Sequence, residues 1–481
     1  MSDSVFRNYI AGEWVEGNKG SVANISPADI SDVVGQYAQA DKAQTEAAIA
    51  AAAAGQLEWQ KSGLEQRYSV LMAIGDELIA RKDELGELLA REEGKTLAEG
   101  VGETYRSGQF FHYYAAEVLR QMGETAESVR PGIEIETRRE PVGVVGIITP
   151  WNFPTATGAW KIAPALAFGN AVVWKPANQV PASAWALTEI ISRQGLPAGT
   201  MNLVMGPGAE VGDVLINSRG INALTFTGSL ETGRKVAAAT AVNLVKCQLE
   251  MGSKNALVVL DDADLDNAVE CAVGGAFGGT GQKCTASSRL IVTEGIHDRF
   301  VAAMVERMKK LVVGHPLKPG VHIGAVADAR QMEQNLNYLE VAKKEGGNLV
   351  YGGEVLTEET EGYYMQPALF TETTNQMTIN REEAFAPIAC IIRVKDYDEA
   401  LVTLNDTNFG LTGGICTESL KYATDFKRNA KTGCVMVNLP TAGTDYHVPF
   451  GGRKDSSFGP REQGTYAKEF YTVVKTTYIR G

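Results

Sequence analysis

The feature that most constrains the fold is the alternation of short apolar runs with helical stretches through the middle of the chain. Apolar runs of the length of buried strands lie at 142–149, 171–175, 201–205 and 223–226. In a second series, strands are predicted at 255–260 and 289–292, and helices at 264–277 and 297–311. Strands that alternate with helices form βαβ units, so the pattern predicts an α/β fold with parallel sheets.

The two ends of the chain have a different pattern. Before the first run, alanine content and helical spacing of leucines predict helices at 43–54, 65–93 and 99–122. Residues 133–138 alternate in polarity, as in a half-buried strand. The tail from residue 469 is rich in β-branched and aromatic residues, and because an unpaired edge strand of this kind would be unusual, it predicts a paired strand.

Length and composition limit the classes of protein. The chain has 481 residues, which fits two or three domains, and a net charge of −13 without a basic run, which argues against nucleic acid or anionic membranes as partners. The six cysteines contain no CxxC pair, which favours a reducing, cytoplasmic compartment over a disulfide framework. The start lacks the pattern of a signal peptide, and no run reaches ~20 apolar residues, so no membrane span is expected.

Cys284 is the candidate nucleophile. It lies among small residues, in Gly-Gly-Thr-Gly-Gln-Lys-Cys-Thr, where backbone amides can approach a reacting carbonyl. Lys283 adjoins it, and a neighbouring cation favours the thiolate. A thiolate attacks aldehydes and leaves readily from thioesters. The alternative is a buried, inert cysteine, which is the usual state of a free cysteine.

Two further polar residues follow apolar strands. Glu250, beside Met251-Gly-Ser, would activate water if burial raised its pKa; the alternative is a salt-bridged residue at a strand end. Asn152, in Pro-Trp-Asn-Phe-Pro, would donate to an oxyanion, although asparagine beside proline also suits a turn. From the residues alone both alternatives stay open.

Glycines after two strands suggest sites for phosphate. Gly228 and Ser229 would place N–H groups and a hydroxyl at the start of a helix, which suits phosphate. The stretch 206–212 is also rich in glycine, but it predicts a strand-to-helix turn without phosphate contact. The five histidines are scattered without the spacing of metal ligands, so no metal is expected, and no local signature supports a cysteine hydrolase.

In their order along the chain, the motifs resemble those of the aldehyde dehydrogenase superfamily. They are PWNFP, WKPA, FTGS, the Glu250 motif, GQKC, EEAFAP and PFGG, from Pro150 to Gly452, and Glu250 and Cys284 lie 34 residues apart as in that family. The resemblance implies that Cys284 attacks the aldehyde, that Asn152 and the Cys284 N–H hold the oxyanion, and that Glu250 activates water to hydrolyse a thioester. Relatives that transfer the acyl group to coenzyme A generally lack this glutamate, so hydrolysis is favoured.

The resemblance also implies a nicotinamide cofactor. Lys175 matches the residue that reaches the adenosine ribose, Gly228 and Ser229 the pyrophosphate turn, and Glu383 and Phe385 the nicotinamide side; further implied contacts are Thr149, Pro150, Trp151, Ala177, Gly208 and Phe226. Where NAD-preferring members have KPxE, this chain has Asn178. Since a carboxylate there would repel a 2′-phosphate, NADP is expected to be accepted, with NAD also used.

The implied fold is a Rossmann-like cofactor domain, an α/β catalytic domain and a small β flap for oligomerisation. We assign 1–122 and 142–249 to the cofactor domain, 250–448 to the catalytic domain, and 123–141 and 464–481 to oligomerisation strands. The tail strand would pair with a neighbouring subunit, in a homodimer or a homotetramer.

The amino-acid sequences of residues 278–290 and 439–454 resemble those of the α-ketoglutaric semialdehyde (2,5-dioxopentanoate) dehydrogenases of bacteria. For such an anionic substrate Arg106 is the candidate cation, although a solvated helix arginine is an equal alternative. Phe153, Trp160 and Lys283 complete the predicted substrate site. Succinate semialdehyde dehydrogenases usually have arginine where this chain has Trp160, which disfavours that substrate, while the aromatic wall also admits aromatic or amide-bearing aldehydes. A non-catalytic, crystallin-like member would lack Cys284 or Glu250, and both are present.

Overall fold

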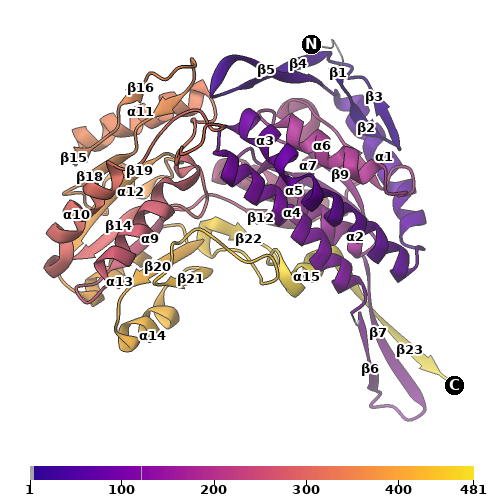
Figure 1. Cartoon of the computed structure of the whole chain (residues 1–481). Coiled ribbons are helices and arrows are strands. Elements are labelled where there is room, and N and C mark those ends of the chain that lie inside the picture. The colour runs from indigo at the N-terminus through magenta and orange to yellow at the C-terminus, as the bar shows by residue number, and fades with distance from the viewer. Residues whose placement is uncertain (1–4, 121) are drawn as a thin grey trace.

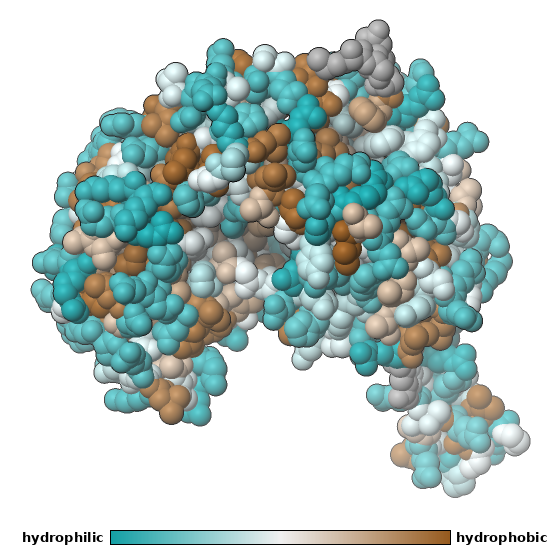
Figure 2. Space-filling model, viewed as in Figure 1, coloured by the Kyte–Doolittle hydropathy of each residue, from teal (hydrophilic) through white to brown (hydrophobic). Residues whose placement is uncertain are grey.

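The computed structural model describes residues 5–120 and 122–481. Figure 1 shows two lobes, one built from the first half of the chain and one from the second, with a β arm that projects away from the first lobe. Both lobes present a mostly hydrophilic surface in Figure 2, and a hollow separates them on this face. No helix among these residues is both long and apolar enough to cross a membrane.

The first lobe is built on a mostly parallel sheet that confirms the predicted strands. Within the described residues its eight strands follow the order β22 (Ser457–Phe458), β12 (Lys246–Glu250), β11 (Ala223–Thr227), β8 (Val144–Ile148), β9 (Ala171–Lys175), β10 (Met201–Leu203), β2 (Asn8–Ile10) and β3 (Glu13–Val15). From β8 the chain proceeds outward to β9 and β10, and then crosses back to β11 and β12 on the other side. The order therefore reverses between β8 and β11, where α/β sheets bind their ligands.

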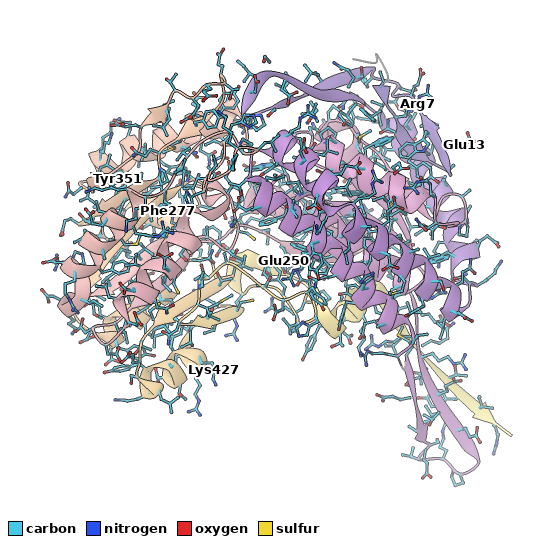
Figure 3. All side chains as sticks on the ribbon, viewed as in Figure 1. Arg7, Glu13, Glu250, Phe277, Tyr351 and Lys427 are labelled. Atoms are coloured by element: carbon cyan, nitrogen blue, oxygen red, sulfur yellow. The ribbon has the colours of Figure 1, made fainter. Side chains whose placement is uncertain are left out.

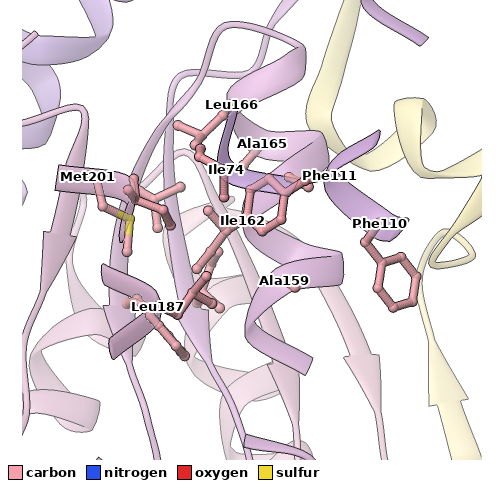
Figure 4. Close-up of a cluster of buried hydrophobic side chains, with 14 of the residues drawn as sticks. Ile74, Phe110, Phe111, Ala159, Ile162, Ala165, Leu166, Leu187 and Met201 are labelled. Atoms are coloured by element: carbon pink, nitrogen blue, oxygen red, sulfur yellow. The ribbon is translucent and has the colours of Figure 1, made fainter. Parts of the chain in front are cut away.

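Helices cover both faces of this sheet because its strands are apolar on both faces. Val145, Ile147 and Trp174 pack against one group of helices, whereas Val144 and Val173 pack against the other. Figure 4 shows Ile74, Phe111 and Ile162 on helices of the first group. The first group is α2 (Leu64–Ala80), α3 (Lys82–Glu93), α4 (Leu97–Val118), α5 (Pro154–Ala167) and α6 (Pro181–Ser192). The second is α1 (Lys42–Trp59), α7 (Asp213–Asn217) and α8 (Leu230–Asn243).

The single helix predicted over 65–93 is wrong, because α2 and α3 are separate. Arg81 lies between them with φ −100° and ψ 13°, outside the helical range. Asp83 and Glu84 in the first turn of α3 favour a new helix start, since acids are stabilised at a helix N-terminus. The predicted third helix ends at Val118, and residue 121 lies outside the described part of the chain.

The second lobe has a mixed sheet, seven-stranded in the described residues, in the order β15 (Asn348–Tyr351), β18 (Ala368–Thr371), β19 (Ile388–Val394), β14 (Ser287–Thr293), β13 (Asn255–Val259), β20 (Thr412–Cys416) and β21 (Cys434–Val437). Its helices are α9 (Leu265–Phe277), α10 (Glu294–Met308), α11 (Ala329–Lys344), α12 (Thr378–Arg381), α13 (Tyr397–Asn405) and α14 (Leu420–Asn429). Smaller pairings join β1 (Val5–Phe6) and β4 (Ser21–Ser26) to β5 (Asp29–Ala38), and β16 (Val355–Leu356) to β17 (Tyr364–Met365).

The arm consists of β6 (Gly123–Glu127), β7 (Ile133–Pro141) and β23 (Thr472–Arg480), in the order β23-β7-β6 (Figure 1). The tail strand is paired, as predicted, but with its own chain: β23 runs antiparallel to β7 from Thr472 opposite Pro141 to Arg480 opposite Ile133. One edge of the tail strand is thus paired within the chain, and the expected pairing with a neighbouring subunit stays a prediction for its other edge. The strand also begins later than expected, because α15 (Lys468–Tyr471) precedes it.

Candidate active site

A tight turn presents Cys284 between α9 and the central strand β14. Gly279, Thr280 and Gly281 all have left-handed φ values, 59°, 56° and 66°. A Cβ on Gly281 would lie 2.1 Å from the Ala386 carbonyl oxygen, so only glycine fits this position. The Asn255 amide donates to the Cys284 carbonyl over 2.7 Å and fixes the backbone at the sulfur-bearing residue.

Cys284 lies where two cavities meet. One, of about 350 Å³, is lined by residues at the carboxyl ends of the first sheet. The other, of about 300 Å³, lies between α4, α5 and the loop before β22. Cys284, Phe153 and Trp160 line both cavities. Because they share the sulfur, ligands bound in the two cavities can meet at Cys284; we call them the cofactor-side and the substrate-side cavity.

Asn152 reaches the Cys284 turn from the loop after β8. Its Nδ2 donates to the Gln282 carbonyl over 2.9 Å, and the residue is only 6% exposed. An amide nitrogen carries two hydrogens, so one remains for a ligand. Lys95 anchors the loop by donating to the Asn152 carbonyl over 2.6 Å and to Glu103 over 2.8 Å. The structure thus brings a free donor beside the candidate nucleophile.

Glu250 ends β12 where the two lobes meet (Figure 3). It is 3% exposed, and Ser457 Oγ donates to its carboxylate over 2.6 Å. Burial, followed by the charge of Glu462, holds its pKa well above the ordinary value. Lys161 donates to Glu462 and, over 2.7 Å, to Thr225. A carboxyl with a raised pKa beside further proton-carrying groups suits a general base.

In this conformation the Glu250 side chain lines neither cavity. Its charge still acts on the nucleophile, because burial, then Glu383 and then Glu250, raise the pKa of the Cys284 thiol. The Lys283 ammonium lies 3.5 Å from a Glu99 carboxylate oxygen, and the expectation that Lys283 favours the thiolate stays a prediction.

Many of the predicted cofactor contacts gather around the cofactor-side cavity. Pro150, Trp151, Gly228, Ser229, Glu383 and Phe385 line it. Ser229 caps the N-terminus of α8, so backbone N–H groups and the helix dipole face this space. The rings of Trp151 and Phe385 meet edge to face with centroids 5.4 Å apart.

Glu383 completes this wall. It accepts from Ser253 N over 2.8 Å, and burial raises its pKa to about 7. A Cβ on Gly252 would lie 2.0 Å from a Glu383 oxygen, which explains the glycine there. An anion site at a helix start, an aromatic wall and a carboxylate for hydroxyl groups are the chemistry that a nicotinamide dinucleotide requires.

Other predicted cofactor residues lie outside this cavity. Lys175 ends β9 and donates to the Asn178 side chain over 3.5 Å, and burial lowers its pKa to about 8. Ala177, Asn178 and Gly208 do not line the cavity either, and a Cβ on Gly212 of the 208–212 turn would lie 3.8 Å from Lys175 Cδ. Thr149 and Phe226 are buried: Thr149 accepts from Trp174 over 3.0 Å, and Phe226 packs beneath Gly228. These two support the site from behind.

The substrate-side cavity contains all four predicted substrate residues: Arg106, Phe153, Trp160 and Lys283. The Arg106 guanidinium lies 5.3 Å from the centre of the Tyr446 ring and forms no ion pair with any residue that the structure describes. Phe110 and Phe450 add apolar walls. A half-buried, unpaired guanidinium over an aromatic ring is suited to binding a carboxylate.

Several residues of the site were not predicted from the sequence. Lys95, Lys161, Ser457 and Glu462 hold Asn152 or surround Glu250, and Gln463 lines the substrate-side cavity. Each is a single polar residue far along the chain from its partner, so no local pattern distinguishes it from a surface residue. The sequence indicated site residues only where they belong to a short motif that follows a strand or a turn.

Comparison with known proteins agrees with this geometry. Residues 14–477 match the aldehyde dehydrogenase family. An alpha-ketoglutaric semialdehyde dehydrogenase of Bacillus subtilis is 41% identical over 480 residues, 99% of this chain and 98% of the relative. An alpha-ketoglutarate semialdehyde dehydrogenase of Haloferax volcanii is 39% identical over 98% of each chain.

Solved structures share the whole fold. Betaine aldehyde dehydrogenase from Staphylococcus aureus, in complex with NAD+, superposes with a TM-score of 0.96 at 33% identity, covering 98% of this chain and 95% of that one. A 3,6-anhydro-L-galactose dehydrogenase in complex with NADP gives 0.96 at 32%, covering 99% and 100%. The chain therefore belongs to the aldehyde dehydrogenase family and is an oxidoreductase that acts on an aldehyde with a nicotinamide cofactor.

Proposed function

We propose that this enzyme oxidises 2,5-dioxopentanoate, or a closely similar anionic semialdehyde, to the carboxylate. The observation that carries the proposal is the unpaired Arg106 guanidinium in the same cavity as Cys284. The relatives at 39–41% identity are named for the same substrate, as alpha-ketoglutarate semialdehyde or 2,5-dioxopentanoate dehydrogenases. An anionic chain with its aldehyde at Cys284 would place its carboxylate toward Arg106.

In the proposed mechanism the Cys284 sulfur adds to the aldehyde carbon. Asn152 Nδ2 and the Cys284 backbone N–H donate to the oxygen that becomes negative, and Lys95 keeps the Asn152 loop in place. When bound, the nicotinamide supplies a positive charge that favours the thiolate and accepts the hydride that leaves the substrate carbon. The product on Cys284 is a thioester.

Hydrolysis of that thioester would depend on Glu250. Its carboxylate removes a proton from water, the water oxygen adds to the acyl carbon, and the C–S bond breaks to return Cys284 and release the acid. Because Glu250 lines neither cavity here, we propose that its side chain turns from Ser457 toward Cys284 for this step. Glu462, whose charge raises the pKa of Glu250, is the neighbouring carboxylate that can receive the proton in turn, and Lys161 holds Glu462 in place.

For the cofactor we propose that NADP is accepted and that NAD is also used. Gly228 and Ser229 would bind the pyrophosphate, Glu383 and Phe385 the nicotinamide side, and Lys175 with Asn178 the adenosine ribose. The amide of Asn178 carries no charge that would repel a 2′-phosphate.

Asn178→Glu should shift the preference toward NAD. A carboxylate next to Lys175 would accept from the ribose 2′-hydroxyl of NAD and repel the 2′-phosphate of NADP. We expect the ratio of kcat/KM with NADP to kcat/KM with NAD to fall by about tenfold or more. Asn178→Gln, which keeps the amide, is the control; an unchanged ratio in Asn178→Glu would show that this position does not face the ribose.

Arg106→Leu should raise KM for anionic semialdehydes without affecting hexanal. Loss of a charge-assisted hydrogen bond to the substrate carboxylate predicts an increase of about tenfold or more in KM for 2,5-dioxopentanoate. Arg106→Lys, which keeps the charge, should lose less. Equal changes for hexanal and 2,5-dioxopentanoate would contradict the proposed substrate and leave the aromatic wall, which suits neutral aldehydes, as the specificity element.

We further propose which function each part of the chain has. Residues 1–122 and 142–249 would form the cofactor domain and 250–448 the catalytic domain, although residues 1–4 lie outside the described part. The arm, 123–141 with 464–481, would mediate association into a homodimer or homotetramer: apart from Thr472 at its start, β23 is mostly exposed, and it pairs along only one of its edges, with β7. All six cysteines are free, which supports a cytoplasmic location.

A further inference from the structure

Gln463 is an unusual residue in the wall of the substrate-side cavity. It is 2% exposed, and its Oε1 is buried without a hydrogen-bond partner among the described residues. Its backbone has φ 61° and ψ 170°, a region that residues other than glycine rarely adopt. A buried amide oxygen without a partner and a strained backbone are both unfavourable for folding, which indicates a functional reason for this residue.

The strained backbone is held from both sides. Glu462 and Phe450 exchange two backbone hydrogen bonds, of 2.8 and 2.9 Å, just before Gln463. Just after it, the Tyr114 hydroxyl donates to the Gly464 carbonyl over 3.2 Å. The side chain of Glu462 is also fixed, by Lys161. These contacts fix the backbone on both sides of Gln463 and hold its side chain in the cavity wall.

A second unpartnered polar atom belongs to the same cavity. The indole Nε1 of Trp160 is buried and has no acceptor among the described residues. Trp160 also lines the wall at Cys284, and Arg106 lines the same space. The cavity therefore combines a nucleophile, a cation and two buried polar atoms that lack partners among the described residues.

We infer that Gln463 binds the 2-oxo group of an α-keto acid semialdehyde, with its carboxamide turned so that the donor Nε2 takes the place of the unpartnered Oε1, and with the Trp160 N–H as a second donor. This rests on the proposed function. In 2,5-dioxopentanoate the 2-oxo oxygen lies on the carbon next to the carboxylate, between the group that Arg106 would bind and the aldehyde at Cys284. A ketone oxygen only accepts hydrogen bonds, which suits wall groups that can donate.

Two substrates separate this contact from the others. 5-Oxopentanoate has the length, the carboxylate and the aldehyde of 2,5-dioxopentanoate and lacks only the 2-oxo group. Gln463→Met keeps the shape of the side chain and removes the donor. We expect kcat/KM for 2,5-dioxopentanoate to fall by about tenfold while the value for 5-oxopentanoate changes by less than about twofold.

Equal losses for both substrates, or no loss for either, would overturn the inference. Trp160→Phe removes the indole donor together with part of the ring; the lost volume should affect both substrates, whereas the lost donor should add a selective loss for 2,5-dioxopentanoate, which keeps the test decisive if Gln463→Met does not fold. The wild-type enzyme tests the proposed function separately: if it prefers hexanal to both semialdehydes, or if Arg106→Leu affects none of the three, the anionic substrate is wrong whatever Gln463 does.

Discussion

Cys284→Ala should abolish aldehyde oxidation, with kcat/KM falling by roughly 10⁴-fold or more, as when the nucleophile of other covalent enzymes is removed. The sulfur is the one reactive atom that both cavities share, so no neighbouring group can replace it. Steady-state rates of cofactor reduction with 2,5-dioxopentanoate measure the loss. Mass spectrometry of the quenched enzyme should show an acyl adduct in the wild type and none in the variant.

Cofactor binding should persist in Cys284→Ala, because Gly228, Ser229, Glu383 and Phe385 remain. Titration with NADP, followed by protein fluorescence, tests this. Cys247→Ala is the matched control, since Cys247 is a half-buried cysteine in β12 that lines neither cavity. Turnover retained in Cys284→Ala, or lost equally in Cys247→Ala, would remove Cys284 from its assigned role.

Glu250→Gln should stop the reaction after the thioester has formed. Loss of a general base predicts a fall of about 10²- to 10⁴-fold in kcat. The first turnover should survive, because Cys284 and Asn152 are intact, so stopped-flow absorbance should show a burst of reduced cofactor equal to the enzyme concentration. Glu270→Gln, on the exposed surface of α9 with Arg307 as its partner, is the control and should turn over normally.

The pH dependence of hydrolysis provides an independent measure of Glu250. Burial, and then the charge of Glu462, raise the pKa of Glu250, and only its carboxylate form can accept a proton from water. The rate of thioester hydrolysis should therefore rise with pH through this raised pKa and fall below it. Rapid-quench measurements should find that Glu250→Gln has lost this dependence. A variant without a burst would instead place Glu250 at or before thioester formation.

The fold could be predicted largely from the sequence because its signals are local. Residues 171–175 form a strand as predicted, since a continuous apolar run can be buried on both faces only inside a covered sheet. The break between α2 and α3 at Arg81 escaped prediction because leucines continue at helical spacing across it. The partner of β23 also escaped, since the strand pattern of 472–480 does not indicate which edge it joins.

For the candidate site, too, some features could be predicted from the sequence and others could not. The sequence by itself indicated Cys284, Glu250 and Asn152 as the candidates, because each occupies a motif that resembles one of the aldehyde dehydrogenase family. Only the tertiary structure decided how they act: it directs Lys283 to Glu99 and buries Glu250 against Ser457 and Glu462. It also leaves Gln463 Oε1 in the cavity wall without a hydrogen-bond partner among the described residues. The physical reason is that burial and hydrogen bonding, which set the pKa and reactivity of each group, come from residues distant in the chain.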